Sequence, residues 1–298
     1  MKKALRGLAE RYRALPKEFR LKDWDPGDTA GLDLGKKGAA ELLARGTQRL
    51  ADLQGRVYAD HEWSVLLLFQ APDAAGKDSA IKHVFSGVNP QGCRVAAFKE
   101  PSPRELSHDF LWRCEQELPE RGQIGIFNRS YYEEVLVVRV HPELLEKERV
   151  PRELLGKNLW QQRYESINEF ERHLARNGTR LLKFYLNVSQ EEQRKRFLER
   201  LEKRDKNWKF SERDLTERAL WKKYQKAYED AIRATSTKDA PWYVVPADHK
   251  WFTWLVLSEV INSALEKLNL DYPKLDAGRR RELAKIRKAL EKEEEKKK

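Results

Sequence analysis

The stretch from Val65 to Ile81 constrains the fold of this chain more than any other. Its five consecutive apolar residues, 65–69, are typical of a parallel strand that is buried on both faces. A turn rich in Ala, Pro and Asp follows, and Gly76-Lys77 then leads into a predicted helix. Backbone N–H groups at such a helix N-terminus bind phosphate, and the Lys adds a mobile positive charge. The sequence therefore predicts a strand, a phosphate-binding loop and a helix, with Lys77 at a solvent-facing ligand site.

The loop departs from the standard P-loop pattern G-x-x-x-x-G-K-[ST]. Ala71 stands in the place of the first Gly, Asp78 stands in the place of the hydroxyl that binds Mg²⁺, and Ser79 comes one residue late. Asp73 lies within the loop, where polyanions repel a carboxylate unless a cation intervenes. We expect Asp73 to bind Mg²⁺ or to act as a base for an incoming group. The alternative is an ordinary turn with an Asp cap on the helix, which leaves Lys77 unexplained.

Strands alternate with helices along the rest of the chain. Further strands are predicted at residues 93–98, 123–127, 181–188 and 241–245, and helices at 39–57, 104–116, 152–176 and 251–268. Such alternation is typical of a parallel five-stranded sheet in a three-layer α/β/α fold. We divide the chain into a helical N-terminal extension (1–62), a core (63–270) with an insert at about 189–235, and a charged tail (271–298).

The net charge of +11 is concentrated in two segments. Residues 190–226 hold 13 Lys/Arg against 8 Asp/Glu, and residues 279–298 hold 10 against 5. The first segment is predicted to be a basic helical lid over bound phosphates, with Arg194, Arg196, Arg200 and Arg204 on one helix. The alternative is a solvated helix with ion pairs such as Glu192–Arg196. The second segment is predicted to be a solvated, non-catalytic tail.

Two further positions carry candidate chemistry. Arg129 follows the third predicted strand and is a candidate phosphate or transition-state clamp, whereas Asn128 stands where P-loop enzymes usually place a metal-binding Asp. His108-Asp109 is predicted to lie in a helix and to be structural. Cys93 and Cys114 are too few for a disulfide framework and lack the spacing of metal ligands. With no apolar stretch of 18 residues and no signal-peptide pattern, we expect a cytoplasmic protein.

Several motifs together resemble one family. D-A-A-G-K-D-S-A-I-K-H-V, F-K-E-P-S, H-D-F-L-W-R, L-P-E-R-G-Q-I-G-I-F-N-R-S-Y-Y-E-E-V and A-P-W-Y-V-V-P-A-D-H-K occur in unbroken order between residues 20 and 270. In this respect the chain is similar to the second polyphosphate kinase family, the polyphosphate:nucleotide phosphotransferases. The resemblance implies a thymidylate-kinase-like P-loop kinase fold with a helical lid. It also implies reversible phosphoryl transfer between polyphosphate and nucleotides, with Mg²⁺ as cofactor and Mn²⁺ as its substitute.

The resemblance also assigns roles to residues. Asp73, Lys77 and Arg129 would be catalytic, and Asp73 would hold the metal. The residues expected to bind phosphate or nucleotide are Ala74, Ala75, Gly76, Lys77, Asp78, Ser79, Lys82, Lys99, Asn128, Arg129 and, in the K-N-W-K motif, Lys206 and Lys209. Asn128 in place of Asp resembles the subclass that phosphorylates both AMP and ADP.

The expected ligands are inorganic polyphosphate, AMP, ADP and ATP. We expect the protein to form a homo-oligomer (a dimer or tetramer) and to bind neither nucleic acid nor a membrane. An ATP-dependent nucleoside monophosphate kinase shares the fold and the loop, but its small donor does not require so extended a basic lid. A nucleic-acid-binding protein would use Trp208, Trp221, Tyr224 and Tyr228 as stacking platforms. Their near-helical spacing favours packing instead, and the phosphate-binding loop would go unexplained.

Overall fold

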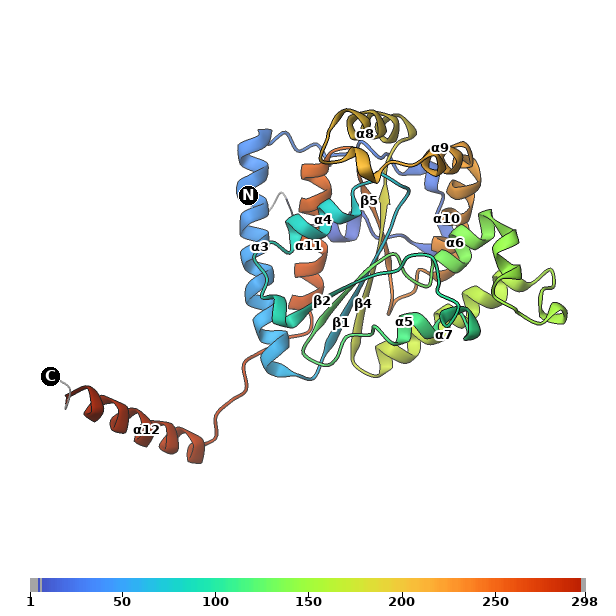
Figure 1. The fold of residues 1–298 in the computed structure, drawn as a ribbon. Coiled ribbons are helices and arrows are strands. Elements are labelled where there is room, and N and C mark those ends of the chain that lie inside the picture. The colour runs from blue at the N-terminus through green and yellow to red at the C-terminus, as the bar shows by residue number, and fades with distance from the viewer. Residues whose placement is uncertain (1–4, 6, 296–298) are drawn as a thin grey trace.

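The predicted buried strand is β1 (Ser64–Gln70), the central strand of a five-stranded parallel sheet. The structure is a computed structural model that describes residue 5 and residues 7–295. The strand order is β2-β3-β1-β4-β5, with β2 at Cys93–Ala97, β3 at Ile124–Asn128, β4 at Thr179–Asn187 and β5 at Trp242–Pro246 (Figure 1). Val65 pairs with Ile124 of β3 and Arg180 of β4. The five-stranded parallel sheet predicted from the sequence is confirmed.

Helices cover both faces of this sheet. One face carries α3 (Gly35–Asp60), α4 (Lys77–Val84) and α11 (Lys250–Glu266), and the other carries α6 (Glu133–Val140), α7 (Leu159–Arg176) and α10 (Trp221–Thr235) (Figure 1). Alternate side chains of β1 point to opposite faces: Leu67 and Phe69 pack under α3 and α11, and Leu66 and Leu68 pack under α6 and α10. Every side chain of β1 is buried. The three-layer α/β/α architecture is therefore confirmed.

The predicted lid lies at the carboxyl edge of the sheet. It begins with α8 (Gln190–Glu202), continues through the 3₁₀ helix η7 (Asn207–Lys209) and ends with α9 (Glu212–Ala219), which leads into α10 (Figure 1). Ser189 caps α8 by accepting a hydrogen bond from the Glu192 backbone N–H at 3.0 Å. The remaining short elements are α2 (Leu8–Arg11), α5 (Trp112–Glu115) and the 3₁₀ helices η1 (Pro16–Glu18), η2 (Leu21–Asp23), η3 (Pro90–Gly92), η4 (Glu105–Ser107), η5 (Pro142–Glu146) and η6 (Arg152–Leu154).

Two helix predictions were wrong in extent. The segment 104–116 contains η4 and α5 but is not one helix, because the Asp109 carboxylate accepts from the Leu111 N–H at 2.9 Å and forms a turn. His108-Asp109 is therefore not helical. The segment 152–176 becomes α-helical only at α7, after a break at Gly156, and Leu154 and Leu155 are left exposed.

The two ends of the chain behave differently. Near the N-terminus, Ala14 N–H donates to Trp242 O and Val244 N–H donates to Tyr12 O, both at 2.8 Å, so this segment extends the sheet beyond β5. Near the C-terminus, α12 (Ala277–Glu295) stands apart from the rest of the molecule (Figure 1). Residues 277–293 of this helix are exposed, and the non-catalytic role of the tail remains a prediction. None of the described helices is both long and apolar enough to cross a membrane.

Candidate functional site

The phosphate-binding loop, residues 71–76, joins the carboxyl end of β1 to the first residue of α4. Two of its residues have a left-handed backbone, Ala74 at φ 61° and Gly76 at φ 104°. Positive φ angles within a turn allow successive N–H groups to converge, as they do in anion-binding loops. The φ of Gly76 is one that residues with side chains rarely adopt, which explains why glycine is needed at this position. The backbone is therefore that of an anion-binding loop although Ala71 replaces the first Gly.

Lys77 begins α4 and is half-buried. Its Nζ donates to the carbonyl oxygen of Ala71 at 2.9 Å. The pKa of Lys77 is lowered to about 8, chiefly by burial and also by the nearby Arg129 cation, against the opposing effect of Asp73. The ammonium is thus held beside the loop carbonyl while the side chain stays partly exposed, and the solvent-facing ligand site remains a prediction.

Arg129 connects the loop to α6. Its backbone is left-handed (φ 66°) and its N–H donates to Phe69 O of β1 at 3.0 Å. Its guanidinium lies between two carboxylates, with Nη2 3.3 Å from Asp73 Oδ1 and Nη1 3.4 Å from Glu133 Oε2. Burial raises the pKa of Glu133, and Arg129 and Lys77 oppose the shift. The structure thus brings together Asp73, Lys77 and Arg129, the three residues predicted to be catalytic, and adds Glu133.

Asn128, the last residue of β3, pairs with the second unusual position of the loop. Its Nδ2 donates to Asp78 Oδ1 at 2.8 Å. The neutral amide at the usual metal-binding position therefore faces a carboxylate at the usual hydroxyl position. An Asp at position 128 would place two carboxylates in contact, where one of them would need a proton or a cation. The two departures from the P-loop pattern thus compensate each other.

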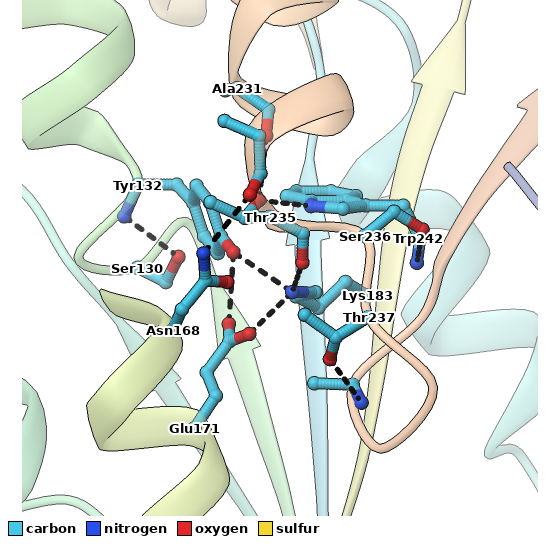
Figure 2. Close-up of polar contacts among 12 residues, drawn as sticks. Ser130, Tyr132, Asn168, Glu171, Lys183, Ala231, Thr235, Ser236, Thr237 and Trp242 are labelled. Carbon is cyan, nitrogen blue, oxygen red and sulfur yellow. Dashed lines mark hydrogen bonds and ion pairs between the residues drawn. The ribbon is translucent and has the colours of Figure 1, made fainter. Parts of the chain in front are cut away.

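A buried network anchors the turn that follows Arg129 (Figure 2). The hydroxyls of Tyr131 and Tyr132 both donate to Glu171 Oε1 of α7 at 2.9 Å. Lys183, fully buried in β4, donates to Tyr132 Oη at 2.9 Å, to Glu171 Oε2 at 2.5 Å and to Thr235 O of α10 at 2.7 Å. Each buried charge has partners, so the network ties the turn before α6 to α7, α10 and β4 behind Arg129.

A cavity of about 330 Å³ opens beside Asp73 and Arg129. Its floor near the loop is polar, and its walls are formed by the segment after β2, by α6 and η5, and by α9 and α10. The lining residues include Lys99, Pro101, Leu106, Arg113, Glu133, Val137, Val138, Leu144, Glu217, Arg218, Trp221, Tyr224 and Tyr228. Apolar walls and a few convergent charges are typical of a small-molecule site. The near-helical spacing of Tyr224 and Tyr228 predicted packing, but these two side chains also line the cavity.

The other predicted binding residues lie in the loop, on α4 and in the predicted lid. Ala74 and Ala75 are buried within it, and Lys82 lies exposed on α4. Ser79 Oγ is 3.5 Å from His83 Nδ1, and Lys206 Nζ pairs with Glu199 Oε1 at 3.3 Å. The side chain of Lys209 lies outside what the structure describes.

Arg196 is the lid residue that departs most from the sequence analysis. Its guanidinium points inward, away from the solvated face of α8, and only 6% of its side chain is exposed. The Glu192–Arg196 ion pair that was considered as the alternative does form, and a second pair of the same spacing joins Glu199 to Lys203. Gln193 was not predicted as a site residue, but it is only 3% exposed and its side chain donates to Asp73 O at 2.9 Å. Gln193 and Arg196 are three residues apart, which places them on the same face of α8. This spacing was the signal in the sequence that could have identified Gln193.

The residues present fit a metal that is held jointly with substrate. Among the described residues, no group of three His, Cys, Asp or Glu side chains could hold a metal by itself. Mg²⁺ in phosphoryl-transfer sites is typically bound by one or two carboxylates together with phosphate oxygens and water. Asp73, one-third exposed at the edge of the cavity, offers such a carboxylate.

A loop for anions, an arginine between two carboxylates and an adjoining cleft are the parts of a phosphoryl-transfer site. The profile of the family described as polyphosphate kinase 2 matches residues 33–273, which is more than half of the chain. The chain belongs to the polyphosphate kinase 2 family. The resemblance found in the sequence motifs is thereby confirmed.

Alignments with similar proteins extend over almost the whole chain. An ADP-polyphosphate phosphotransferase from Rhodopseudomonas palustris is 50% identical over 286 residues, which cover 92% of this chain and 99% of the relative. An AMP/ADP-polyphosphate phosphotransferase from Meiothermus ruber is 49% identical over 266 residues, covering 89% and 95%. The crystal structure of polyphosphate kinase 2 from Arthrobacter aurescens superimposes with a TM-score of 0.84 at 40% identity, covering 93% of this chain and 96% of the other. The predicted P-loop kinase fold is confirmed.

Proposed function

We propose that this polyphosphate kinase 2 family member transfers a phosphoryl group from inorganic polyphosphate to AMP and to ADP, forming ADP and ATP. An acceptor phosphate oxygen forms a bond to the terminal phosphorus of the chain, and the bond to the next phosphate breaks. Polyphosphate shortens by one unit, and the reaction is reversible. The observation that carries the proposal is the Arg129 guanidinium, set between Asp73 and Glu133 where the phosphate-binding loop meets the cavity.

The proposed roles follow from charge and position. Lys77 and the loop N–H groups would neutralise the transferred phosphoryl group, and Arg129 would stabilise charge that develops on its equatorial oxygens. Asp73 would hold a divalent cation, Mg²⁺ or in its place Mn²⁺, which when bound neutralises charge on the phosphates. Lys82, Lys206 and Lys209 would follow the polyphosphate chain. Removal of divalent cations with EDTA should abolish transfer, and added Mg²⁺ should restore it.

The acceptor range is the finer part of the proposal. Both relatives described above act on ADP according to their names, and one also acts on AMP. The cavity beside Asp73 and Arg129 is the proposed acceptor site, with Lys99 on its wall. Because Asn128 is neutral and already paired with Asp78, position 128 adds no negative charge against a second acceptor phosphate.

A direct experiment compares donors and acceptors. The purified protein is incubated with AMP or ADP and either long-chain polyphosphate or ATP, and the nucleotides are resolved over time. Polyphosphate should drive AMP through ADP to ATP. Transfer from ATP to AMP without use of polyphosphate would instead support the ATP-dependent nucleoside monophosphate kinase. The expected cytoplasmic location and homo-oligomeric state remain predictions.

A further inference from the structure

Helix α8 holds the back of the phosphate-binding loop. Gln193 Nε2 donates to Asp73 O at 2.9 Å, and Arg196 Nη1 donates to Ala74 O at 3.2 Å and to Ala75 O at 2.7 Å. Three consecutive loop carbonyls are therefore bonded to two neighbouring side chains of one helix face. Both of these side chains belong to residues that are at least nine-tenths buried. The first lid helix is thus fixed to the loop that it was predicted to cover.

The guanidinium of Arg196 is fully used by the protein. In addition to the two loop carbonyls, Nη2 donates to Ala247 O at 2.6 Å and to Asp248 O at 3.1 Å, and Nε donates to Glu192 Oε1 at 2.8 Å. An arginine has five N–H groups, and these contacts use all five. Arg196 therefore has no N–H left for a donor phosphate, although it belongs to the basic lid. It instead joins the loop to the segment after β5.

This anchoring fixes the direction of the loop N–H groups. In a planar trans peptide the carbonyl of one residue and the N–H of the next point in opposite directions. With the carbonyls of Asp73, Ala74 and Ala75 turned toward α8, the N–H groups of the following residues point away from it. The Ala75 N–H donates to Pro72 O at 3.2 Å, which leaves those of Ala74 and Gly76 for an anion.

Gln193 also connects the loop to the second lid helix. Its Oε1 accepts from Arg218 Nη1 of α9 at 2.8 Å, and the same Nη1 donates to Gln190 O at 2.8 Å. Glu217, which precedes Arg218 in α9, accepts a hydrogen bond from Tyr224 Oη at 2.6 Å. Its carboxylate also lies 2.9 Å from Nε2 of His141, at the end of α6. Helix α9 thus reaches the loop on one side and α6 on the other.

We propose that Gln193 and Arg196 are positioning residues for the phosphate-binding loop, and that Gln193 transmits the docking of α9, through Arg218, to the backbone of Asp73. The inference rests on the proposed polyphosphate-dependent function, because the loop would bind the phosphates that react. It assigns α8 to the fixed part of the site.

The first experiment separates anchoring from donor binding. Arg196→Met and Arg196→Lys are compared with Lys195→Met, which removes an exposed cation paired with Glu191 on the same helix. Both Arg196 variants should lose about a hundredfold in kcat, with little change in the KM for polyphosphate, because a lysine cannot reach four carbonyls at once. Lys195→Met should stay near the unmodified protein.

The opposite pattern would overturn the anchoring role. If Arg196 binds the donor, Arg196→Met should raise the KM for polyphosphate, more for long chains and at low salt, and Arg196→Lys should recover most of the loss. Should Arg196→Met fail to fold, the lysine variant still distinguishes the two patterns. An Arg196→Lys variant with unchanged kcat would also contradict the proposal.

A double-mutant cycle tests the link through Gln193. Gln193→Met and Arg218→Met should each lower kcat by about tenfold, and the double variant should lose little more than either single one, because both break the same connection. Losses that multiply to about a hundredfold would show that α9 does not act on the loop through Gln193.

Amide hydrogen exchange without substrate gives a readout that does not depend on the reaction. Exchange in a peptide covering residues 71–77 should be faster in Arg196→Lys than in the unmodified protein and unchanged in Lys195→Met. Equal exchange in all three would overturn the anchoring role. An unmodified protein that is inactive with polyphosphate would contradict the proposed function, whereas the exchange difference would still support the anchoring of the loop.

Discussion

The depressed pKa of Lys77 predicts an alkaline loss of activity that ordinary lysines do not produce. With a pKa of about 8 in the free enzyme, about nine-tenths of the Lys77 side chains are neutral at pH 9, so kcat/KM for polyphosphate should fall about tenfold between pH 7 and pH 9. A lysine with an ordinary pKa would lose only about 3% of its charge there. Substrate phosphates have a second pKa near 6 and do not titrate in this range. The assay is the initial rate at low polyphosphate from pH 6 to pH 10.

The control is Lys77→Arg, whose guanidinium stays charged throughout. Whatever activity it retains should show no alkaline fall below pH 10. A flat profile for the unmodified protein, or the same fall in Lys77→Arg, would refute the reasoning. In kcat the fall should move to higher pH, because bound phosphates stabilise the ammonium.

The lowered pKa of Lys77 also affects the free energy of unfolding. The folded pKa of Lys77 lies below its unfolded value of 10.5, so the unfolded chain binds more protons between about pH 8 and pH 10.5. The buried ammonium therefore destabilises the fold fully below pH 8, and this effect disappears as the pH rises. Lys77→Met should unfold with a free energy higher by roughly 1 to 3 kcal/mol at pH 7, while losing transfer activity. A variant that is less stable than the unmodified protein would contradict this account.

Three further predictions concern the neighbouring groups. Asp73→Asn should lower kcat about a hundredfold at any Mg²⁺ concentration; recovery at high Mg²⁺ would limit Asp73 to metal affinity. Lys183→Met should cost about 3 to 5 kcal/mol in denaturant unfolding by leaving Glu171 unpaired, and adding Glu171→Leu should recover most of it; additive losses would contradict this. Asn128→Asp, which sets two carboxylates together, should change the ratio of AMP to ADP turnover about tenfold in initial rates; an equal loss on both acceptors would place the choice elsewhere.

The parts of the site that the sequence predicted are those encoded locally. The apolar run 65–69, the loop after it and Arg129 at the end of the next paired strand follow from strand burial and from the parallel alignment of strand ends. The buried Lys183 also left a signal, because a lysine within the apolar strand 181–186 requires a partner. Its partner Glu171 could not be named, because α7 carries several acidic residues and packing selects one of them.

The parts that it did not predict depend on distant backbone. Arg196 lies on a charged helix, and its carbonyl partners are 122 residues earlier and 51 residues later in the chain. The composition of α8 predicts a basic, solvent-exposed helix, but in the folded protein the Arg196 side chain points inward. The break within 104–116 arises from a side-chain-to-backbone hydrogen bond at Asp109, which competes with a helix of adequate propensity.

The pairing of the N-terminal segment with β5 has a consequence for the synthesis of this protein. Ala14 O accepts from Ser236, 222 residues later, and the Leu21 N–H donates to Glu229, 208 residues later. At about 5 to 20 residues per second, a ribosome would take roughly 10 to 45 s to supply these partners. During that interval the side chains of Tyr12, Phe19 and Leu21, buried in the finished protein, lack the residues of α10 and α11 that pack against them. The first segment therefore completes its packing only after the last strand has been synthesised.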